Sequence, residues 1–189
     1  MKIKQFIKKT LASVGLVHPS LGVKTSQENK AAILLKQKDS SIKIFVETGT
    51  HAGWMIDKIG DKFERVYSIE LDDSLFSAAA ERFKDKRNVR LYHGDSAILI
   101  NDILKDLDDR AVFWLDAHGS GEITADNAPV VKELESIFAH PLKSHLIFID
   151  DARHFDRKTI YKIKQITKTN HYNFLIEDGV FELTPKHAN

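Results

Sequence analysis

From residue 41 onward, short apolar runs alternate with stretches of helical periodicity, and this alternation restricts the fold more than any other feature. The apolar runs are rich in β-branched and aromatic residues, which is typical of strands. We predict strands at residues 42–47, 65–70, 89–92, 111–116, 145–150, 172–176 and 180–183. We predict helices between them at residues 54–59, 74–83, 97–107, 129–138 and 159–166.

Strands that alternate with helices predict a parallel sheet with helices on both faces. Several of the runs are apolar throughout, as expected for strands that are covered on both sides. Asp178-Gly179 separates the last two runs and is a strong signal for a two-residue hairpin, so the final strand should be antiparallel. The predicted fold class is therefore α/β, with a doubly wound, mostly parallel seven-stranded sheet that ends in an antiparallel hairpin strand.

Composition narrows the function classes. The 189 residues suit one domain with a short extension. Cysteine is absent, which excludes disulfides, thiolate zinc sites and iron–sulfur clusters. The 28 basic and 27 acidic residues give a net charge of +1, so no nucleic-acid partner is expected.

The first forty residues predict a helical extension (1–40) ahead of a main domain (41–189). Lys8 and Lys9 interrupt the first apolar stretch, so we expect no signal peptide and a cytoplasmic location. The first helix has two interpretations: it packs on the domain with a solvated basic face, or it makes weak contact with an anionic membrane surface. Ser26, with Glu28 and the apolar stretch 31–35, predicts a second helix. The first helix is predicted from apolar residues at helical spacing between lysines: Ile3, Phe6, Ile7 and Leu11.

Acidic residues collect at the carboxyl ends of the predicted strands, where open α/β sheets bind their ligands. An acid ends or closely follows each of the first five strands: Glu47, Glu70, Asp95, Asp116, and the pair Asp150 and Asp151. A chance arrangement would not place an acid at nearly every such position. The sequence therefore predicts a ligand site at this edge of the sheet.

The turn after the first strand contains Gly49 and Gly53, which let the backbone bend and approach a ligand closely. Its spacing is neither that of a dinucleotide site nor that of a phosphate loop, which disfavours a nicotinamide oxidoreductase. Glu70 ends the second strand and is suited to accept hydrogen bonds from both hydroxyls of a ribose. Asp72 or Asp73 fits the role of helix cap better than Glu70 does. Together these features predict a nucleoside ligand.

This set of residues resembles the class I S-adenosylmethionine-dependent methyltransferases, whose fold is Rossmann-like. The resemblance covers about residues 41–185 and rests on Glu47-x-Gly49-x-x-x-Gly53, Glu70, Gly94-Asp95-Ser96, Asp116 and the final hairpin. It implies S-adenosylmethionine as cofactor, with Gly49 and Gly53 near its methionine part and Glu70 on its ribose. Asp95 and Ser96 would lie near the adenine. Glu47, Thr50 and Asp116 belong to the same expected cofactor site.

Asp116, Asp150 and Asp151 should converge at neighbouring strand ends, where their mutual repulsion would be relieved by a hard divalent cation. The arrangement resembles the metal-dependent O-methyltransferases of the catechol and macrocin type. That likeness implies Mg²⁺ or Mn²⁺ on the three acids, holding adjacent acceptor hydroxyls. The alternative is that Asp150 and Asp151 cap the next helix or pair with Arg153 and Arg157.

His118 is a candidate general base for the acceptor hydroxyl beside Asp116, or else an exposed loop histidine. The polar segment 119–127 is expected to close over the substrate, or to be a long surface loop. The predicted function is metal-assisted O-methylation of a hydroxylated small molecule or a sugar or glycan precursor. A homo-oligomer is compatible with the sequence.

Two alternatives share this fold: a non-catalytic protein that binds a nucleoside ligand, and a nucleic-acid methyltransferase. The second is disfavoured because Leu115-Asp116-Ala117-His118 stands where such enzymes carry an Asn/Asp-Pro-Pro-aromatic segment.

Overall fold

A computed structural model describes residues 25–116 and 129–186 of the chain. Seven strands form one sheet in the order β3-β2-β1-β4-β5-β7-β6. The first five strands are parallel, and β7 runs antiparallel between β5 and β6. The bounds of the strands are β1 Ile44–Thr48, β2 Arg65–Glu70, β3 Val89–His93, β4 Ala111–Leu115, β5 Leu146–Ile149, β6 Tyr172–Glu177 and β7 Val180–Pro185. The predicted doubly wound α/β class with a final antiparallel hairpin is confirmed.

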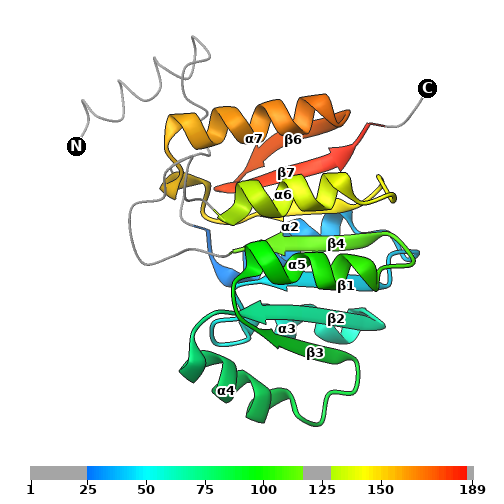
Figure 1. Ribbon diagram of the computed structural model, residues 1–189, viewed down its shortest axis with the longest axis vertical. Coiled ribbons are helices and arrows are strands. Elements are labelled where there is room, and N and C mark those ends of the chain that lie inside the picture. The colour runs from blue at the N-terminus through cyan, green and yellow to red at the C-terminus, as the bar shows by residue number, and fades with distance from the viewer. Residues whose placement is uncertain (1–24, 117–128, 187–189) are drawn as a thin grey trace.

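Helices cover both faces of the sheet, as the apolar character of its strands predicts. Figure 1 shows α5 Ser96–Lys105, α6 Pro129–Ala139 and α7 Arg157–Thr169 in front of the sheet. Behind it, α2 Gln27–Gln37 and α3 Trp54–Ile59 pack on the other face, and α4 Asp73–Phe83 contributes Ala79 and Phe83 to the same core. Alternate strand residues divide between two cores: Ile44 and Val46 of β1 face α5 and α6, whereas Phe45 faces α2 and α3.

The hairpin between β6 and β7 forms as predicted. Asp178 and Gly179 have φ angles of 45° and 80°, the left-handed conformations that a type I′ turn requires. Helix starts follow capping side chains: Ser26 accepts a hydrogen bond from Asn29 N at the start of α2. The predicted helix at residues 159–166 begins earlier, at Arg157, because Asp156 caps it.

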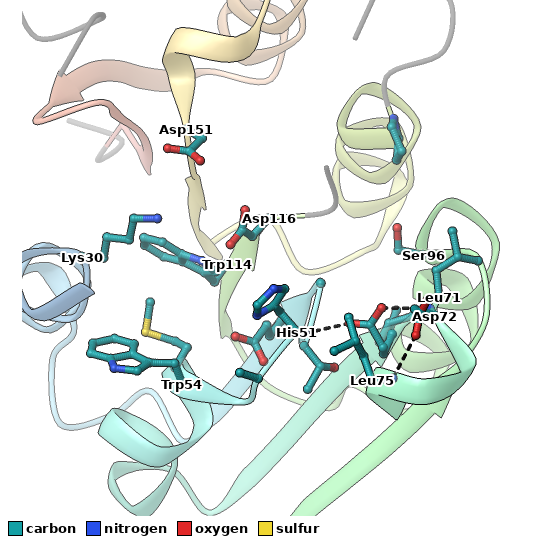
Figure 2. A pocket seen from close by; sticks show the side chains of 18 of the residues that line it. Lys30, His51, Trp54, Leu71, Asp72, Leu75, Ser96, Trp114, Asp116 and Asp151 are labelled. Atoms are coloured by element: carbon teal, nitrogen blue, oxygen red, sulfur yellow. Dashed lines mark hydrogen bonds between the residues drawn. The ribbon is translucent and has the colours of Figure 1, made fainter. Parts of the chain in front are cut away.

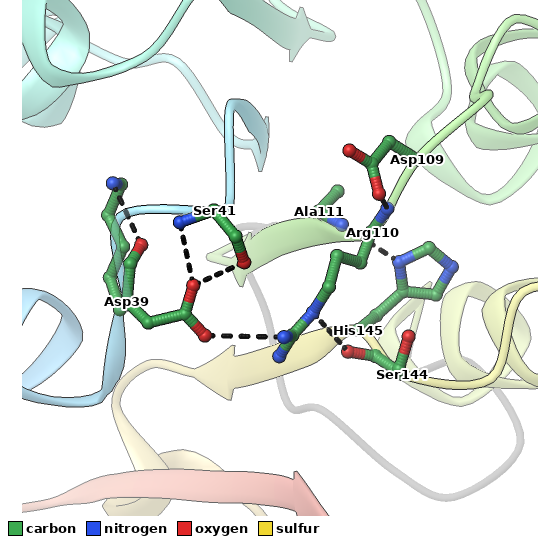
Figure 3. A network of polar contacts seen from close by, with 8 residues as sticks. Asp39, Ser41, Asp109, Arg110, Ala111, Ser144 and His145 are labelled. Carbon is green, nitrogen blue, oxygen red and sulfur yellow. Dashed lines mark hydrogen bonds and ion pairs between the residues drawn. The ribbon is translucent and has the colours of Figure 1, made fainter.

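Helix α2 is tied to the sheet at the edge opposite the strand ends that carry the acids (Figure 3). Arg110, just before β4, donates to Asp39 Oδ2 at 3.2 Å and to the Ser144 carbonyl at 3.2 Å. Asp39 in turn accepts from the Ser41 backbone N–H at 2.8 Å. The turn between α2 and β1 is thereby fixed to β4 and β5. The division of the chain at residue 40 stays a prediction.

Within the described residues, no helix combines the length and apolar character needed to cross a membrane. The predicted first helix lies outside those residues, so its membrane contact is an untested expectation.

Candidate functional site

A cavity of about 1100 Å³ opens at the carboxyl ends of β1, β2 and β4. Because β1 lies between β2 and β4, the chain crosses over on either side of it, and the loops that follow diverge at this point. Most of the predicted site residues line the cavity: Glu47, Gly49, Thr50, Glu70, Asp95, Ser96, Asp116 and Asp151. Figure 2 shows Asp116 and Asp151 at neighbouring strand ends, across the cavity from the segment that carries Leu71 and Asp72.

Three predicted residues differ from this pattern. Gly53 does not line the cavity; it begins α3, and a Cβ placed on it would lie 2.4 Å from Phe83 Cε2. Asp150 lies beneath the cavity wall rather than on it, with 1 % of its surface exposed. His118 and the segment 119–127 fall outside the described residues.

The loop after β1 is fixed by backbone hydrogen bonds to the end of β2. The N–H groups of Gly49 and Thr50 both donate to the Ile69 carbonyl, at 2.9 and 3.2 Å. Gly49, His51 and Gly53 all have φ angles in the left-handed region, at 82°, 47° and 72°. The glycines supply this geometry without strain, so the sequence prediction of a sharp bend is confirmed.

Glu70 is held as a rigid acceptor at the cavity wall. Its Oε2 accepts from the backbone N–H of His51 at 2.7 Å, and its Oε1 accepts from the backbone N–H of Asp72 at 2.9 Å. A carboxylate has about four acceptor positions, so both oxygens keep capacity for a ligand's hydroxyls. Asp72 caps α4 by accepting from Ser74 N and Leu75 N, as predicted, which leaves Glu70 for the cavity.

Glu47 is a buried acid at the floor of the cavity. Burial, with repulsion from Asp116 and Glu70, raises its pKa to about 8, and a 2.7 Å hydrogen bond from Ser68 Oγ opposes the shift. Ser68 Oγ also lies 2.7 Å from Thr50 Oγ1, so the three side chains form one polar chain under the glycine loop. A cation that entered the cavity would favour the ionised form of Glu47.

Asp95 and Ser96 line the cavity beyond the end of β3. Asp95 is the N-cap of α5 and accepts from Ala97 N at 2.9 Å. The preceding Gly94 donates its N–H to the Glu70 carbonyl at 2.8 Å, which joins this turn to the end of β2. The two residues expected near an adenine therefore lie on a turn that is joined to the end of β2.

The acids expected to bind a metal do not fit that role. The ammonium of Lys30 pairs with Oδ2 of Asp150, and Oδ1 of Asp150 accepts from the Asp151 backbone N–H at 2.6 Å. Asp151 Oδ1 pairs with Arg153 at 3.1 Å, as the alternative interpretation anticipated. No set of three His, Cys, Asp or Glu side chains within residues 25–116 and 129–186 is arranged to hold a metal ion. Mg²⁺ or Mn²⁺ at this site is thus unsupported, because side-chain cations already pair with two of the acids.

The pKa of Asp150 nevertheless differs from its ordinary value. Burial and the nearby charge of Asp116 raise the pKa of Asp150 to about 6, while the pairing with Lys30 opposes that rise. Leu115 and Ile149 are register partners at the ends of β4 and β5, so Asp116 and Asp150, which follow them, lie at neighbouring strand ends as predicted.

Sequence reasoning missed Lys30. It lies on α2, lines the cavity and is buried, although α2 was predicted only as part of an extension. A signal was present: Lys30 and Leu34 are one helical turn apart, so the apolar face that buries Leu34 also carries the lysine.

Comparison with known proteins identifies the fold. No family model and no curated protein sequence matches the chain. Solved structures do match, at low identity. The SAH-bound methyltransferase PaMTH1 of Podospora anserina is 15 % identical, with a TM-score of 0.58 over 86 % of this chain and 80 % of that one.

Precorrin-6y C5,15-methyltransferase from Geobacter metallireducens is 14 % identical, with a TM-score of 0.60 over 86 % of this chain and 90 % of that one. The N-methyltransferase NodS from Bradyrhizobium japonicum is 12 % identical, with a TM-score of 0.56 over 85 % and 97 %. These likenesses show that the chain has the Rossmann-like fold of class I methyltransferases, as the sequence predicted.

Proposed function

We propose that the chain is an S-adenosylmethionine-dependent methyltransferase that acts on a hydroxyl oxygen of a small hydroxylated acceptor, such as a sugar or glycan precursor. The observation that carries the proposal is Glu70. Its carboxylate is fixed by two backbone N–H groups at the cavity wall and keeps acceptor capacity toward the cavity. A pair of adjacent ribose hydroxyls matches such an acceptor.

The other residues that line the cavity support a cofactor that binds with its ribose at Glu70. Asp95 and Ser96 continue the wall beyond Glu70 and would face the base of the nucleoside. Glu47 lies on the other side of Gly49, where its carboxyl would meet the cationic amino and sulfonium groups of S-adenosylmethionine. The bound cofactor supplies an electrophilic methyl group on sulfur.

The far side of the cavity would receive the acceptor. Lys30, Asp116, Asp151 and Arg153 line it, a polar set with both donors and acceptors of hydrogen bonds. Hydroxyl groups both donate and accept, so they suit such a surface. Asp116 or Asp151 can accept the acceptor's hydroxyl proton. The proposed acceptor is a small molecule rather than a nucleic acid, and the proposal includes no metal because side-chain cations pair with Asp150 and Asp151.

Calorimetric titration of the full chain with S-adenosylmethionine and with S-adenosylhomocysteine tests the cofactor, with NADH as the control ligand. Glu70→Ala should weaken both affinities by roughly tenfold to a hundredfold, since it removes charge-assisted hydrogen bonds. Glu64→Ala is the matched control, because Glu64 is an exposed acid just before the other end of β2. Absence of binding to the wild-type chain, or an equal loss in both variants, would refute the proposal.

A non-catalytic nucleoside-binding protein predicts the same titration but no turnover. The two are separated by methyl transfer from radiolabelled S-adenosylmethionine to a panel of sugars and diols. Asp116→Asn combined with Asp151→Asn should abolish the transfer while S-adenosylhomocysteine still binds.

A further inference from the structure

The pairing of Lys30 with Asp150 joins residues 120 positions apart in the sequence at the acceptor side of the cavity. Lys30 comes from α2, and Asp150 directly follows β5. Both side chains are buried, and Lys30 also lines the cavity. Figure 2 shows Lys30 extending from α2 past Trp114 toward the strand ends that carry Asp116 and Asp151.

Positively charged side chains pair with two of the acids at the acceptor side of the cavity. Lys30 pairs with Asp150, and Arg153 pairs with Asp151 at 3.1 Å. Asp116 directly follows Leu115, whose register partner Ile149 precedes Asp150, so the two acids lie at neighbouring strand ends. Three acids that would otherwise repel one another are therefore stabilised by an ammonium and a guanidinium from the protein itself.

Helix α2 can be held to the rest of the domain without a buried ion pair. The same helix carries Lys36, whose ammonium pairs with Glu177 at 3.0 Å on the exposed surface. A buried ion pair contributes little to stability because desolvation offsets its attraction, and apolar side chains often replace it without loss. The position of Lys30 at the cavity wall is better explained by a role toward what the cavity binds.

We propose that the Lys30 ammonium takes the place of a divalent cation in the acceptor site, so that methyl transfer requires no metal. This inference rests on the proposed function. Asp150 occupies one of the three N–H donors of Lys30, which leaves two, as far as the described residues go, for oxygen atoms of the acceptor.

The chemistry balances without a metal. The acceptor oxygen attacks the methyl carbon, the new C–O bond forms, and the C–S bond breaks with its electron pair going to sulfur. The sulfonium becomes a neutral thioether, and the hydroxyl proton passes to Asp116 or Asp151. The Lys30 ammonium stabilises the negative charge that develops on the oxygen.

The test is a titration of the full chain with Mn²⁺, followed by the loss of the free-ion EPR signal. The wild-type chain should bind no Mn²⁺ at the cavity. Lys30→Ala removes the ammonium and should tighten Mn²⁺ binding by about tenfold or more, since Asp116, Asp150 and Asp151 then lack it. Lys36→Ala, on the exposed face of the same helix, is the matched control and should gain nothing.

Adding Asp116→Asn to Lys30→Ala should abolish the gained binding, which would locate the ion at the acids. S-adenosylhomocysteine binding, measured on each variant, shows that the fold is kept. If Lys30→Ala does not fold, Lys30→Met, which keeps the apolar stem, takes its place.

Mn²⁺ binding by the wild-type chain that Asp116→Asn removes would overturn the proposal, as would a folded Lys30 variant that gains no Mn²⁺. Failure of the wild-type chain to bind S-adenosylhomocysteine would instead refute the proposed function, and the Mn²⁺ arms would still decide whether Lys30 occupies a cation position.

Discussion

Replacing Glu47 by Gln should make the chain more stable, and the gain should increase with pH. Glu47 is buried, and its pKa is raised to about 8 from an ordinary value of 4.5, first by burial and then by repulsion from Asp116 and Glu70. The folded chain therefore keeps this proton up to about pH 8, while the unfolded chain releases it near its ordinary value. Stability must fall as pH rises through that window.

The magnitude follows from the shift. Each pH unit within the window removes about 1.4 kcal/mol from the free energy of unfolding. At pH 7 the accumulated loss is about 3 kcal/mol, and between pH 6 and pH 8 the wild-type chain should lose about 2 kcal/mol through Glu47. Glu47→Gln keeps an oxygen that accepts from Ser68 Oγ but has no proton to release, so its stability lacks this dependence.

Urea denaturation at pH 6, 7 and 8, followed by tryptophan fluorescence, measures the effect. The difference in unfolding free energy between Glu47→Gln and the wild-type chain is the quantity to compare, because other titrating groups largely cancel in it. Glu64→Gln, at an exposed acid, is the control and should show no change in this difference. A difference for Glu47→Gln that stays constant from pH 6 to pH 8 would refute the reasoning, since Glu47 would then be ionised throughout.

Two further substitutions test the packing that positions the site. Gly53→Ala should destabilise the chain by about 1–3 kcal/mol, because a Cβ would lie 2.4 Å from Phe83 Cε2 on a residue whose φ is +72°; guanidinium denaturation measures the loss, and an unchanged midpoint would contradict it. Leu34→Ala should reduce stability by about 2–5 kcal/mol, because Leu34 of α2 is fully buried in the core beneath the sheet. A loss below about 0.5 kcal/mol would show that α2 is not part of the folded unit.

The fold could be predicted from the sequence because local patterns specify it. Parallel strands covered on both faces must be apolar throughout, and the strand from Ala111 to Leu115 is fully buried. Asp178-Gly179 can adopt the two left-handed conformations that a tight hairpin needs. For the strands and α-helices of the described residues, the errors lay at element ends, where a capping side chain such as Asp156 decides the boundary, and the short 3-10 helices Gly60–Lys62 and Ala152–His154 were not predicted.

The cofactor side of the site was also predictable, since strand ends in a parallel sheet meet at one edge. Glu47, Glu70 and Asp95 line the cavity for that reason. The acceptor side of the site could not be predicted in the same way. Asp150 and Asp151 are adjacent, and successive residues at a strand end point in different directions, so one faces the cavity and the other lies beneath it. Spacing along the chain shows that acids are near one another but not which cation they contact.

The cation that pairs with Asp150 is Lys30 of α2, so the beginning of the described chain contributes a residue to the cavity. Leu34 packs in the core, Lys36 pairs with Glu177, and Asp39 contacts Arg110 at the far edge of the sheet. These contacts hold the second half of the helix and the turn after it, and the pairing with Asp150 holds Lys30 near the start of the helix. A chain that lacked residues 1–40 would lose the cation at Asp150 as well as part of the core. We therefore expect the segment that sequence patterns set apart as an extension to contribute directly to the acceptor site.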